Sequence, residues 1–502
     1  MPSLSHMENL PRTLGELKKS GYRSRTVKEE LRTNLIANIR AGRTLFEGIH
    51  GYERTVVPAM ERAILAGHSI NLLGLRGQAK TRMARSLVQL LDEWMPVVAG
   101  SEVNDDPFAP ISRHARDLIA VQGDATPITW LHRDQRYTEK LATPDVTVAD
   151  LIGDSDPIKA ANLKLDYSDE RVIHFGLIPR SHRGIFVINE LPDLQPRIQV
   201  ALFNILQEGD VQIRGFKLRL PLDVQFVFTA NPEDYTNRGS IITPLKDRIQ
   251  SQILTHYPPT IEMGMRITAQ ELRSPKDQVA RVRVPDLLRV LVERIATEAR
   301  ESEYVDRKSG VSARLTITAM ESLISAAERR ALRNGEERTV ARISDLQSVV
   351  PAIVGKIELV YEGEQEGAAQ VAHHLISQAV RNTFAELFPD PSKARKVKAG
   401  AAQQRHDPYA PIIAHFESEQ LDLSLEATGA TYEKALRTVD QLMELVKQKH
   451  DYLDGEEQLL WSEFVLHALA EHSRISRTMH AETARFGDLM GSMFASDGPG
   501  QE

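Results

Sequence analysis

The residues best suited to chemistry lie in a glycine-rich stretch that follows an apolar run. Residues 74–81 read Gly-Leu-Arg-Gly-Gln-Ala-Lys-Thr, directly after Ile-Asn-Leu-Leu at 70–73. A strand that stops at such a turn and feeds a helix presents backbone N–H groups, a positive helix end and one lysine to a polyphosphate. We therefore expect ATP here, with Lys80 on the β- and γ-phosphates and the Thr81 hydroxyl on Mg²⁺. The other residues expected to contact the nucleotide are Gly74, Gly77, Gln78 and Ala79.

One position of this loop departs from the usual pattern. Phosphate-binding loops normally place glycine directly before the lysine, and here that residue is Ala79. The alternative interpretation is a chance glycine-rich turn. A second apolar run that ends in polar residues, at 184–190, favours the nucleotide site.

That run, Gly-Ile-Phe-Val-Ile-Asn-Glu, predicts a buried parallel strand, because its apolar residues are nearly continuous. Ligands bind at the carboxyl ends of such strands. A Walker B strand normally ends in Asp-Glu, where Asp holds Mg²⁺ through water and Glu polarises the attacking water. Here Asn189 replaces the aspartate, whereas Glu190 is kept as the expected base. An amide orients a metal-bound water but brings no charge, so we expect slow turnover; the alternative is a site that only binds ATP.

The elements after Glu190 supply a third polar strand end. Residues 198–208 have the apolar spacing of a helix, and apolar residues alternate around 214–215 as in a hairpin. A further buried strand at 224–230 ends at Asn231. An amide at that strand end can hold the attacking water or sense the γ-phosphate. The alternative for Asn231 is a residue that simply starts a turn before proline.

Over residues 45–360 the chain resembles the AAA+ ATPases of the magnesium chelatase subunit I and MoxR group. The resemblance rests on Ile-His-Gly-Tyr-Glu at 49–53, the loop at 74–81, Pro-Arg-Ile-Gln-Val-Ala-Leu at 196–202 and Thr-Ala-Asn-Pro-Glu at 229–233. Ala before the lysine is normal in that group, whereas Asn189 departs from it. The resemblance implies an α/β fold: a P-loop parallel sheet with helices on both faces, followed by a helical lid. An extra C-terminal helical region would come after the lid.

The resemblance also implies two arginines that complete the site. Arg248, after Leu-Lys-Asp, matches the arginine that a neighbouring subunit supplies in trans, where a guanidinium stabilises charge on the transferring phosphoryl group. Arg238 is the less favoured candidate, and either residue could instead form a surface ion pair. Arg314 matches the sensor of the lid in cis. Its alternative is a solvated arginine in the first turn of a helix.

The division of the chain follows from these stretches and from composition. Residues 14–43 are rich in charge and predict helices, and residues 389–398 form a basic, proline-containing break. The apolar residues beyond that break keep helical spacing. We expect an N-terminal helical extension (1–44), the AAA+ core (45–260, with an insertion at about 101–135), the lid (261–362) and a C-terminal helical extension (363–502, with a linker near 389–402).

Composition excludes several classes of site. The 502 residues include no cysteine, which rules out disulfides and thiolate chemistry and suits a reducing cytoplasm. No apolar stretch approaches the roughly eighteen residues that a membrane span requires, and we expect no membrane association. A formal net charge of −7 gives no overall attraction to nucleic acid, and we expect no direct contact with it.

The resemblance implies a ring ATPase, which we expect to be a hexamer, that hydrolyses ATP with Mg²⁺ and remodels or activates a protein partner. In this group that partner commonly carries a von Willebrand type A domain. One alternative is the ATPase subunit of a magnesium chelatase, which inserts Mg²⁺ into a porphyrin. Another is a nucleotide-gated scaffold with little hydrolysis, because of Asn189. Bacterial enhancer-binding activators use the same motor, but the chain has no Gly-Ala-Phe-Thr-Gly-Ala loop and no recognisable helix-turn-helix segment, which disfavours that class.

Overall fold

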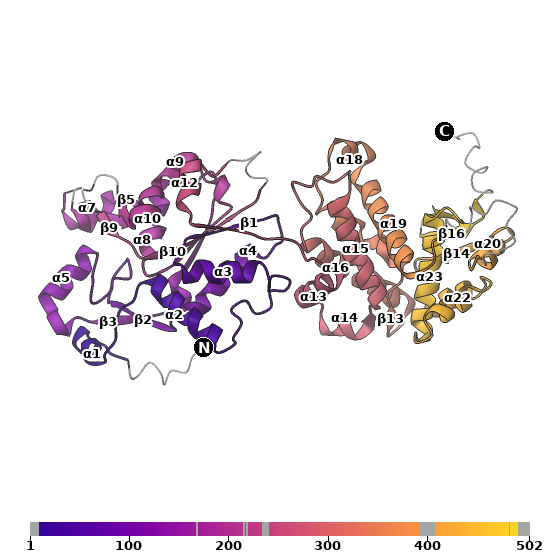
Figure 1. Ribbon diagram of the computed structural model, residues 1–502, viewed down its shortest axis with the longest axis horizontal. Coiled ribbons are helices and arrows are strands. Elements are labelled where there is room, and N and C mark those ends of the chain that lie inside the picture. Colours follow the sequence, from indigo (N-terminus) through magenta and orange to yellow (C-terminus); the bar gives the residue numbers. More distant parts are fainter. Residues whose placement is uncertain are drawn as a thin grey trace. The chain divides into compact units, whose positions relative to one another are not determined.

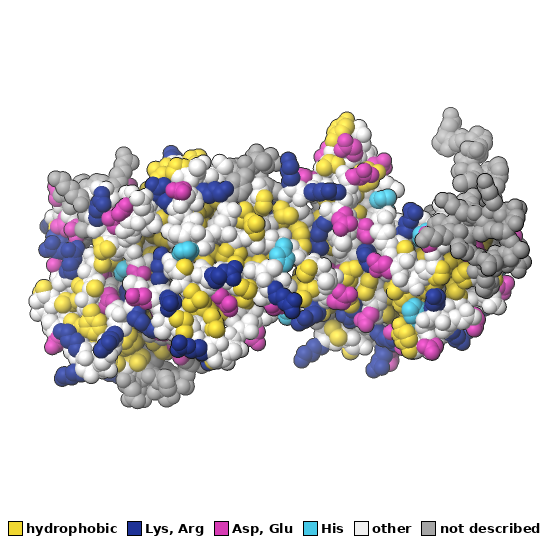
Figure 2. All heavy atoms as spheres, in the orientation of Figure 1, with side chains coloured by type: hydrophobic (Ala, Val, Ile, Leu, Met, Phe, Trp, Pro, Cys, Tyr) yellow, Lys and Arg dark blue, Asp and Glu magenta, His cyan; other side chains and the backbone are white. Residues whose placement is uncertain are grey.

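The computed structural model divides into two compact units, Met1–Tyr257 and Pro258–Glu502 (Figure 1). The structure describes residues 10–166, 169–213, 216, 219–232, 240–391, 407–480 and 482–489. Within these ranges no helix has both the length and the apolar character needed to cross a membrane. Basic and acidic side chains are interspersed over the face shown in Figure 2, so neighbouring charges of opposite sign offset each other there.

The first unit is built on a five-stranded parallel sheet with the order β11-β1-β10-β7-β4. Strands β7 and β10 lie in its interior and are buried along their whole length. Strand order is not chain order, so residues distant in the sequence end at one edge of the sheet. The strands are β1 (Ile70–Leu73), β4 (Tyr137–Leu141), β7 (Gly184–Asn189), β10 (Val224–Ala230) and β11 (Ser251–Leu254).

Helices cover both faces of this sheet, which confirms the predicted α/β class. Successive residues of β7 point to opposite faces. Val187 packs in a core with the helices of one face, whereas Phe186 packs in the core of the other. The first face carries α2 (Val27–Arg40), α3 (Val56–Leu65) and α4 (Lys80–Ser86); the second carries α9 (Pro196–Ala201), α10 (Phe203–Glu208) and α12 (Thr243–Arg248).

The stretch expected as an insertion forms a small layer beside the sheet. Its strand β3 (Ile128–His132) pairs antiparallel with β2 (Trp94–Val98), and α5 (Arg113–Gln122) connects them. Ile128 packs on Leu14 and Leu17 of α1 (Leu14–Lys19).

Smaller elements complete the unit: α6 (Val148–Leu151), β5 (Gly153–Ser155), α7 (Pro157–Leu163), β6 (Ile173–Phe175), α8 (Leu177–Arg180), β8 (Asp210–Gln212) and β9 (Arg219–Pro221).

A buried ion pair fixes α2 to the sheet. Arg136 donates through Nη1 and Nη2 to the two carboxylate oxygens of Glu30, at 2.7 and 2.6 Å. The side chains are only 1 % and 6 % exposed. Arg136 also donates through Nε and Nη2 to the backbone oxygen of Arg183. Burying such an ion pair away from water costs desolvation free energy, but removing one member leaves the other charge buried without a partner.

We expect Glu30→Ala to lower the free energy of unfolding of the first unit by about 3–5 kcal/mol, because Arg136 then keeps a buried charge without a counter-ion. Urea unfolding followed by tryptophan fluorescence measures this in a Trp461→Phe background, which leaves Trp94 and Trp130 of the first unit as reporters.

The matched control is Asp124→Ala. It removes the partner of Lys18 from a pair whose side chains are 52 % and 70 % exposed, so we expect a change within about 1 kcal/mol. Equal losses in Glu30→Ala and Asp124→Ala would contradict the assigned role of the buried pair.

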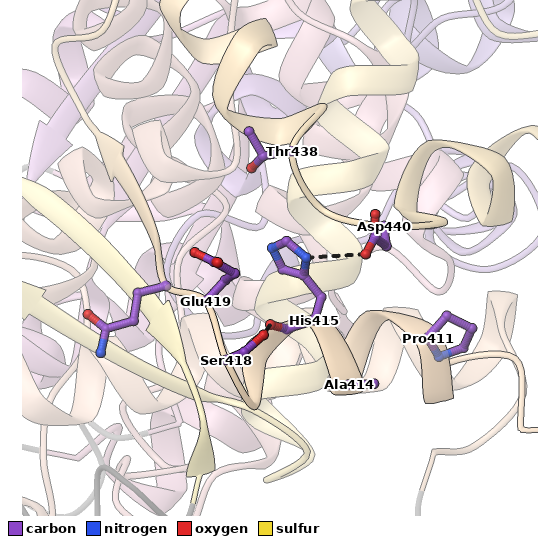
Figure 3. Close-up of a pocket in the computed structure, with 8 residues that line it drawn as sticks. Pro411, Ala414, His415, Ser418, Glu419, Thr438 and Asp440 are labelled. Atoms are coloured by element: carbon purple, nitrogen blue, oxygen red, sulfur yellow. Dashed lines mark hydrogen bonds and ion pairs between the residues drawn. The ribbon is translucent and has the colours of Figure 1, made fainter.

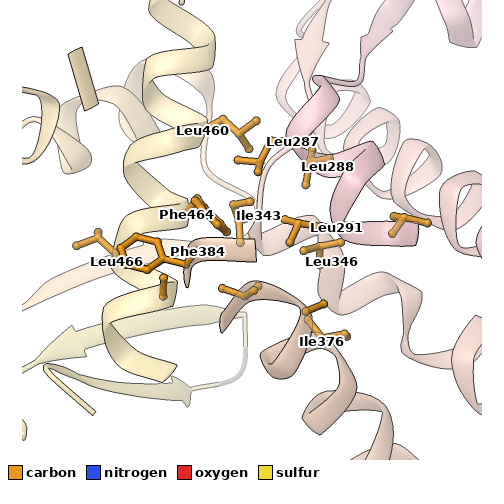
Figure 4. Packing of buried hydrophobic residues seen from close by; sticks show 14 of the residues in the cluster. Leu287, Leu288, Leu291, Ile343, Leu346, Ile376, Phe384, Leu460, Phe464 and Leu466 are labelled. Carbon is orange, nitrogen blue, oxygen red and sulfur yellow. The ribbon is translucent and has the colours of Figure 1, made fainter. Parts of the chain in front are cut away.

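The second unit is largely helical and has one continuous hydrophobic core (Figure 4). That core joins residues from the segment expected as the lid, such as Leu291, to Phe384 and Phe464 of the segment expected as a separate extension. The longer helices are α13 (Ile261–Glu271), α15 (Asp286–Glu301), α16 (Arg314–Asn334), α19 (Ala368–Leu387) and α23 (Gly455–Glu471); the shorter ones are α14 (Lys276–Arg281), α17 (Val350–Val354), α18 (Tyr361–Glu366), α20 (Ala410–Phe416), α21 (Gly429–Leu436) and α22 (Leu442–Lys449).

A buried carboxylate reinforces this shared core. Glu463 of α23 accepts hydrogen bonds from the backbone N–H groups of Ile343 and Ser344, at 2.9 and 3.1 Å, and from the Tyr432 hydroxyl at 2.8 Å. The guanidinium of Arg342 lies 4.0 Å from the centre of the Tyr432 ring. Residues beyond 407 thus satisfy backbone groups near residue 343, which binds the two segments into one unit.

The C-terminal region also contains a sheet that the sequence did not predict. Three antiparallel strands have the order β14-β16-β15: β14 (Leu421–Ser424), β16 (Thr483–Gly487) and β15 (Ser476–His480). Leu421 and Leu423 are buried and alternate with exposed Asp422 and Ser424. That period of two is the signal of a strand, but it is too short to stand out beside long helical stripes. Residues 392–402 of the expected linker lie outside the described residues.

Candidate nucleotide-binding site

The glycine-rich loop lies between β1 and α4, as its sequence predicts. β1 ends at Leu73 and α4 begins at Lys80, with Thr81 next in the same helix. Gly77 has φ of 74° and Ala79 has φ of 56°. Position 79 is thus in the left-handed region, which explains why glycine is usual there; alanine adopts it at a cost of about 1–2 kcal/mol.

Gly74 is required by close packing at the start of the loop. A Cβ at this position would lie less than 3.0 Å from both the Thr255 hydroxyl and the Gln78 side-chain oxygen. Thr255, directly after β11, donates to that Gln78 oxygen at 2.6 Å. Gly74 therefore allows the end of a neighbouring strand to hold Gln78 within the loop.

We expect Gly74→Ala to weaken ATP binding at least tenfold, because its methyl group separates Thr255 from Gln78 and shifts the backbone that faces the phosphates. Titration with a fluorescent ATP analogue measures the loss. Gly455→Ala is the matched control, since a Cβ there meets nothing within 4 Å. Unchanged affinity in Gly74→Ala would show that the loop does not depend on this contact.

Tyr52 contacts the backbone of the glycine-rich loop, a role that was not predicted from the sequence. Its hydroxyl lies 3.0 Å from the backbone oxygen of Gln78 and 2.9 Å from that of His256. Burial raises the pKa of Tyr52 to about 12, so the hydroxyl keeps its proton and can donate to either carbonyl. The only signal for it was its place in the Ile-His-Gly-Tyr-Glu stretch ahead of the loop.

Three of the predicted catalytic and binding residues meet at the strand ends. Lys80 Nζ donates to Asn231 Oδ1 at 2.8 Å and also to the backbone oxygens of Gly74 and Leu75. Asn231 Nδ2 in turn donates to Glu190 Oε2 at 3.4 Å. The sheet order explains the meeting, because β1, β10 and β7 are adjacent and parallel. A lysine, an amide and a carboxylate are thus linked by consecutive hydrogen bonds beside the loop.

Glu190 has an unusual backbone conformation. Its φ of 56° and ψ of 50° place it in the left-handed region, and its N–H donates to the Thr229 hydroxyl at 3.1 Å. Such a conformation costs about 1–3 kcal/mol in a residue other than glycine and is concentrated at functional sites. The turn directs the carboxylate toward the end of β10 rather than along β7.

Asn189 is held by partners on both sides. Its Nδ2 donates to Glu139 Oε1 at 2.6 Å, and its Oδ1 accepts from the Thr229 hydroxyl at 3.1 Å. Glu139 also accepts from Arg85 Nε and Nη2, at 2.8 and 3.0 Å, and from the Tyr137 hydroxyl at 3.0 Å. Burial opposes ionisation of Glu139, but these hydrogen bonds outweigh it and keep its pKa below the usual range. Neither Glu139 nor Thr229 was predicted as a site residue from the sequence.

Of the two predicted arginines, Arg248 belongs to the first unit and Arg314 to the second. Arg248, at the end of α12, donates to Gln207 Oε1 at 3.0 Å and to the backbone oxygen of Pro244 at 2.7 Å. Its guanidinium lies 4.7 Å from the centre of the Phe203 ring. These contacts hold it on the sheet face opposite α4. Arg314 begins α16 in the second unit, and Arg238 lies outside the described residues.

The second unit has a separate hollow of about 810 Å³ (Figure 3). His415 Nδ1 lies 3.6 Å from Asp440 Oδ2 at its wall. The nearby Ser418 hydroxyl donates to the backbone oxygen of His415, at 3.5 Å, rather than to the imidazole. The three side chains therefore do not form the relay that activates a serine nucleophile.

A family model matches the part of the chain that contains two of these strand ends. Residues 166–253 match the model of the sigma-54 interaction domain, an AAA+ domain. This core has the AAA+ fold. The match includes Asn189, Glu190, Asn231 and Arg248, whereas Lys80 lies before it.

Individual proteins match over a short stretch or at low identity. The hydrogenase transcriptional regulatory protein HoxA of Cupriavidus necator is 30% identical over 112 residues, which span 22% of this chain and 23% of that protein. A putative ATPase from Cytophaga hutchinsonii is 16% identical, with 72% of this chain and 97% of that one covered at a TM-score of 0.29. A model of magnesium chelatase subunits BchI and BchD is 19% identical, with 64% and 98% covered at 0.32.

Proposed function

We propose that this protein binds and hydrolyses ATP in an AAA+ ring and uses the cycle to remodel or activate a protein partner. The observation that carries the proposal is the pair of hydrogen bonds that links Lys80 to Asn231 and Asn231 to Glu190 beside the glycine-rich loop. A cation, an amide and a carboxylate in that order suit a γ-phosphate, a water and its general base. The family match over the strands that carry Asn231 and Glu190 supports it.

The residues of the site fit MgATP. Gly74 leaves room for Thr255 to hold Gln78 within the loop, and backbone N–H groups of such a loop can bind phosphates. Thr81 and Asn189 offer the oxygen atoms that Mg²⁺ prefers, and the bound ion would offset charge on the β- and γ-phosphates. Lys80 would exchange its carbonyl partners for phosphate oxygens. Glu190 would then take a proton from the water that Asn231 positions.

Assembly would complete the site. We propose that Arg248 reaches the phosphates of a neighbouring subunit, and that Arg314 acts on the nucleotide within its own subunit. The ring would be a hexamer whose partner carries a von Willebrand type A domain. Arg248 is already oriented by Gln207 and Phe203, so little side-chain entropy remains to be lost when it binds.

Two observations favour other uses of the same motor. The amide at Asn189 favours a nucleotide-gated scaffold with little hydrolysis. The sigma-54 interaction domain match favours an activator that contacts sigma-54, although the chain lacks the Gly-Ala-Phe-Thr-Gly-Ala loop. A magnesium chelatase subunit would need porphyrin-binding partners. A binding assay with purified sigma-54 and ATP tests the activator, since the remodelling ATPase predicts no complex.

Mg²⁺-dependent ATP hydrolysis by the purified chain tests the main proposal, with oligomer mass recorded with and without ATP. Turnover above that of Glu190→Gln, together with ATP-dependent assembly, would support the ring ATPase. Binding and assembly without turnover would replace it with the scaffold. A chain that binds no ATP would overturn both.

A further inference from the structure

The amide of Asn189 can serve MgATP only if the correct atom faces the nucleotide. An aspartate presents an acceptor oxygen whichever way it turns, whereas an asparagine has one acceptor and one NH₂ donor. Mg²⁺ binds oxygen, and a water bound to Mg²⁺ donates its hydrogens, so both need the acceptor oxygen of the amide and not its NH₂ group. An asparagine at this position therefore needs hydrogen-bond partners that fix the orientation of its amide.

The sheet order determines which side of Asn189 faces the loop. β7 lies between β10 and β4, and β1, which carries the glycine-rich loop, lies beyond β10. The NH₂ group of Asn189 points toward β4, where Glu139 accepts from it, and the oxygen points toward β10, where Thr229 donates to it. The oxygen is thus on the nucleotide side.

Glu139 is itself fixed by the helix that begins with the phosphate-binding residues. Arg85 of α4 binds both carboxylate oxygens of Glu139, and Tyr137 donates to one of them. A carboxylate engaged bidentately by a guanidinium only accepts hydrogen bonds. The atom of Asn189 that faces Glu139 must therefore be its nitrogen.

We infer that Glu139 is a positioning residue for magnesium-dependent nucleotide binding: it holds the Asn189 amide so that the oxygen faces MgATP. The negative charge that Walker B strands carry at their end lies here on the neighbouring strand. The inference rests on the proposed function, because it assigns Glu139 to the same MgATP site.

This arrangement reverses the simple expectation for Asn189→Asp. Restoring an aspartate would add the charge that Mg²⁺ favours, but the new carboxylate would occupy the place where Asn189 Nδ2 lies 2.6 Å from Glu139. Two carboxylates cannot both remain charged at that separation without a cation between them. Aspartate at 189 and glutamate at 139 should therefore be incompatible, whereas Glu139→Gln should make the aspartate acceptable.

The test is a double-mutant cycle in the full-length chain. The wild type, Asn189→Asp, Glu139→Gln and Glu139→Gln/Asn189→Asp are titrated with a fluorescent ATP analogue in Mg²⁺ and in EDTA. The readout is the dissociation constant in EDTA divided by the dissociation constant in Mg²⁺, which measures how much Mg²⁺ strengthens binding. A residue with a general structural role would not change this ratio. We expect each single variant to lose about tenfold in this ratio, as for residues that orient metal ligands, and the double variant to return to within a few-fold of the wild type.

The controls separate this inference from folding and from the proposed function. Glu170→Gln removes a carboxylate from an exposed pair with Arg116 and should change nothing. Additive effects, or a higher ratio in Asn189→Asp alone, would overturn the inference while the proposed function stands. If Asn189→Asp fails to fold, recovery of folding in the double variant supports the pair, and its failure to recover counts against it. A wild type that binds no nucleotide would overturn both.

Discussion

Glu190→Gln is expected to lower the rate of ATP hydrolysis by about 10²–10⁴-fold, the usual contribution of a general base. The amide keeps the shape of the side chain and can still meet Asn231, which lies 3.4 Å from the carboxylate. ATP affinity should therefore change little. Steady-state turnover and fluorescent-nucleotide titration on the same preparation measure the two quantities.

Glu102→Gln is the matched control for this substitution. Glu102 pairs with Lys159 at a side chain that is 46 % exposed, so its loss should leave turnover unchanged. Equal turnover in Glu190→Gln and the wild type would show that the carboxylate at the end of β7 is not the base. Loss of binding together with turnover would instead indicate that Glu190 maintains the shape of the site.

Arg248→Ala is expected to lower turnover by about 10³-fold in the assembled protein, because an arginine supplied in trans stabilises charge on the transferring phosphoryl group. The affinity of an isolated subunit for ATP should stay the same. Arg248 lies on α12, on the sheet face opposite the helix that begins with Lys80. Turnover measured over a range of protein concentrations separates assembly from chemistry.

Mixing two inactive variants tests the direction of this contact. Lys80→Ala has a damaged nucleotide site but keeps its arginine, and Arg248→Ala has the reverse defect. Mixed rings should recover a fraction of turnover, since some interfaces then combine an intact site with an intact arginine. Absence of recovery would contradict action in trans. Arg113→Ala, which breaks only an exposed pair with Asp117, is the control.

The structure changes how Asn189 is understood. The sequence alone predicts that Asn189, which lacks the negative charge of the usual aspartate, weakens Mg²⁺ binding and slows turnover. In the fold it belongs to a set of hydrogen bonds that runs from Arg85 through Glu139 and Asn189 to Thr229. Thr229 also accepts from the N–H of Glu190. The amide is therefore part of an organised set of contacts, and its proposed effect on Mg²⁺-dependent nucleotide binding depends on Glu139.

The shared core of the second unit has a similar consequence for the C-terminal region. Glu463 accepts from backbone groups at Ile343 and Ser344, and Phe464 packs on Phe384 with ring centres 5.8 Å apart. A movement of the segment near residue 343 would therefore carry α23 with it.

The sequence alone determined the parts whose signals are local. The loop at 74–81 and the buried strands that end at Asn189 and next to Asn231 follow from residue order, because strand and turn preferences act over a few neighbouring positions. The α/β class was implied by the family resemblance that those motifs carry. Tertiary structure alone decided which side chains meet. Glu139 lies 50 residues from Asn189 in the chain, and Tyr52 lies 26 residues from Gln78. The first contact arises from strand order and the second from the packing of the segment ahead of α3 against the loop, and no local pattern encodes either.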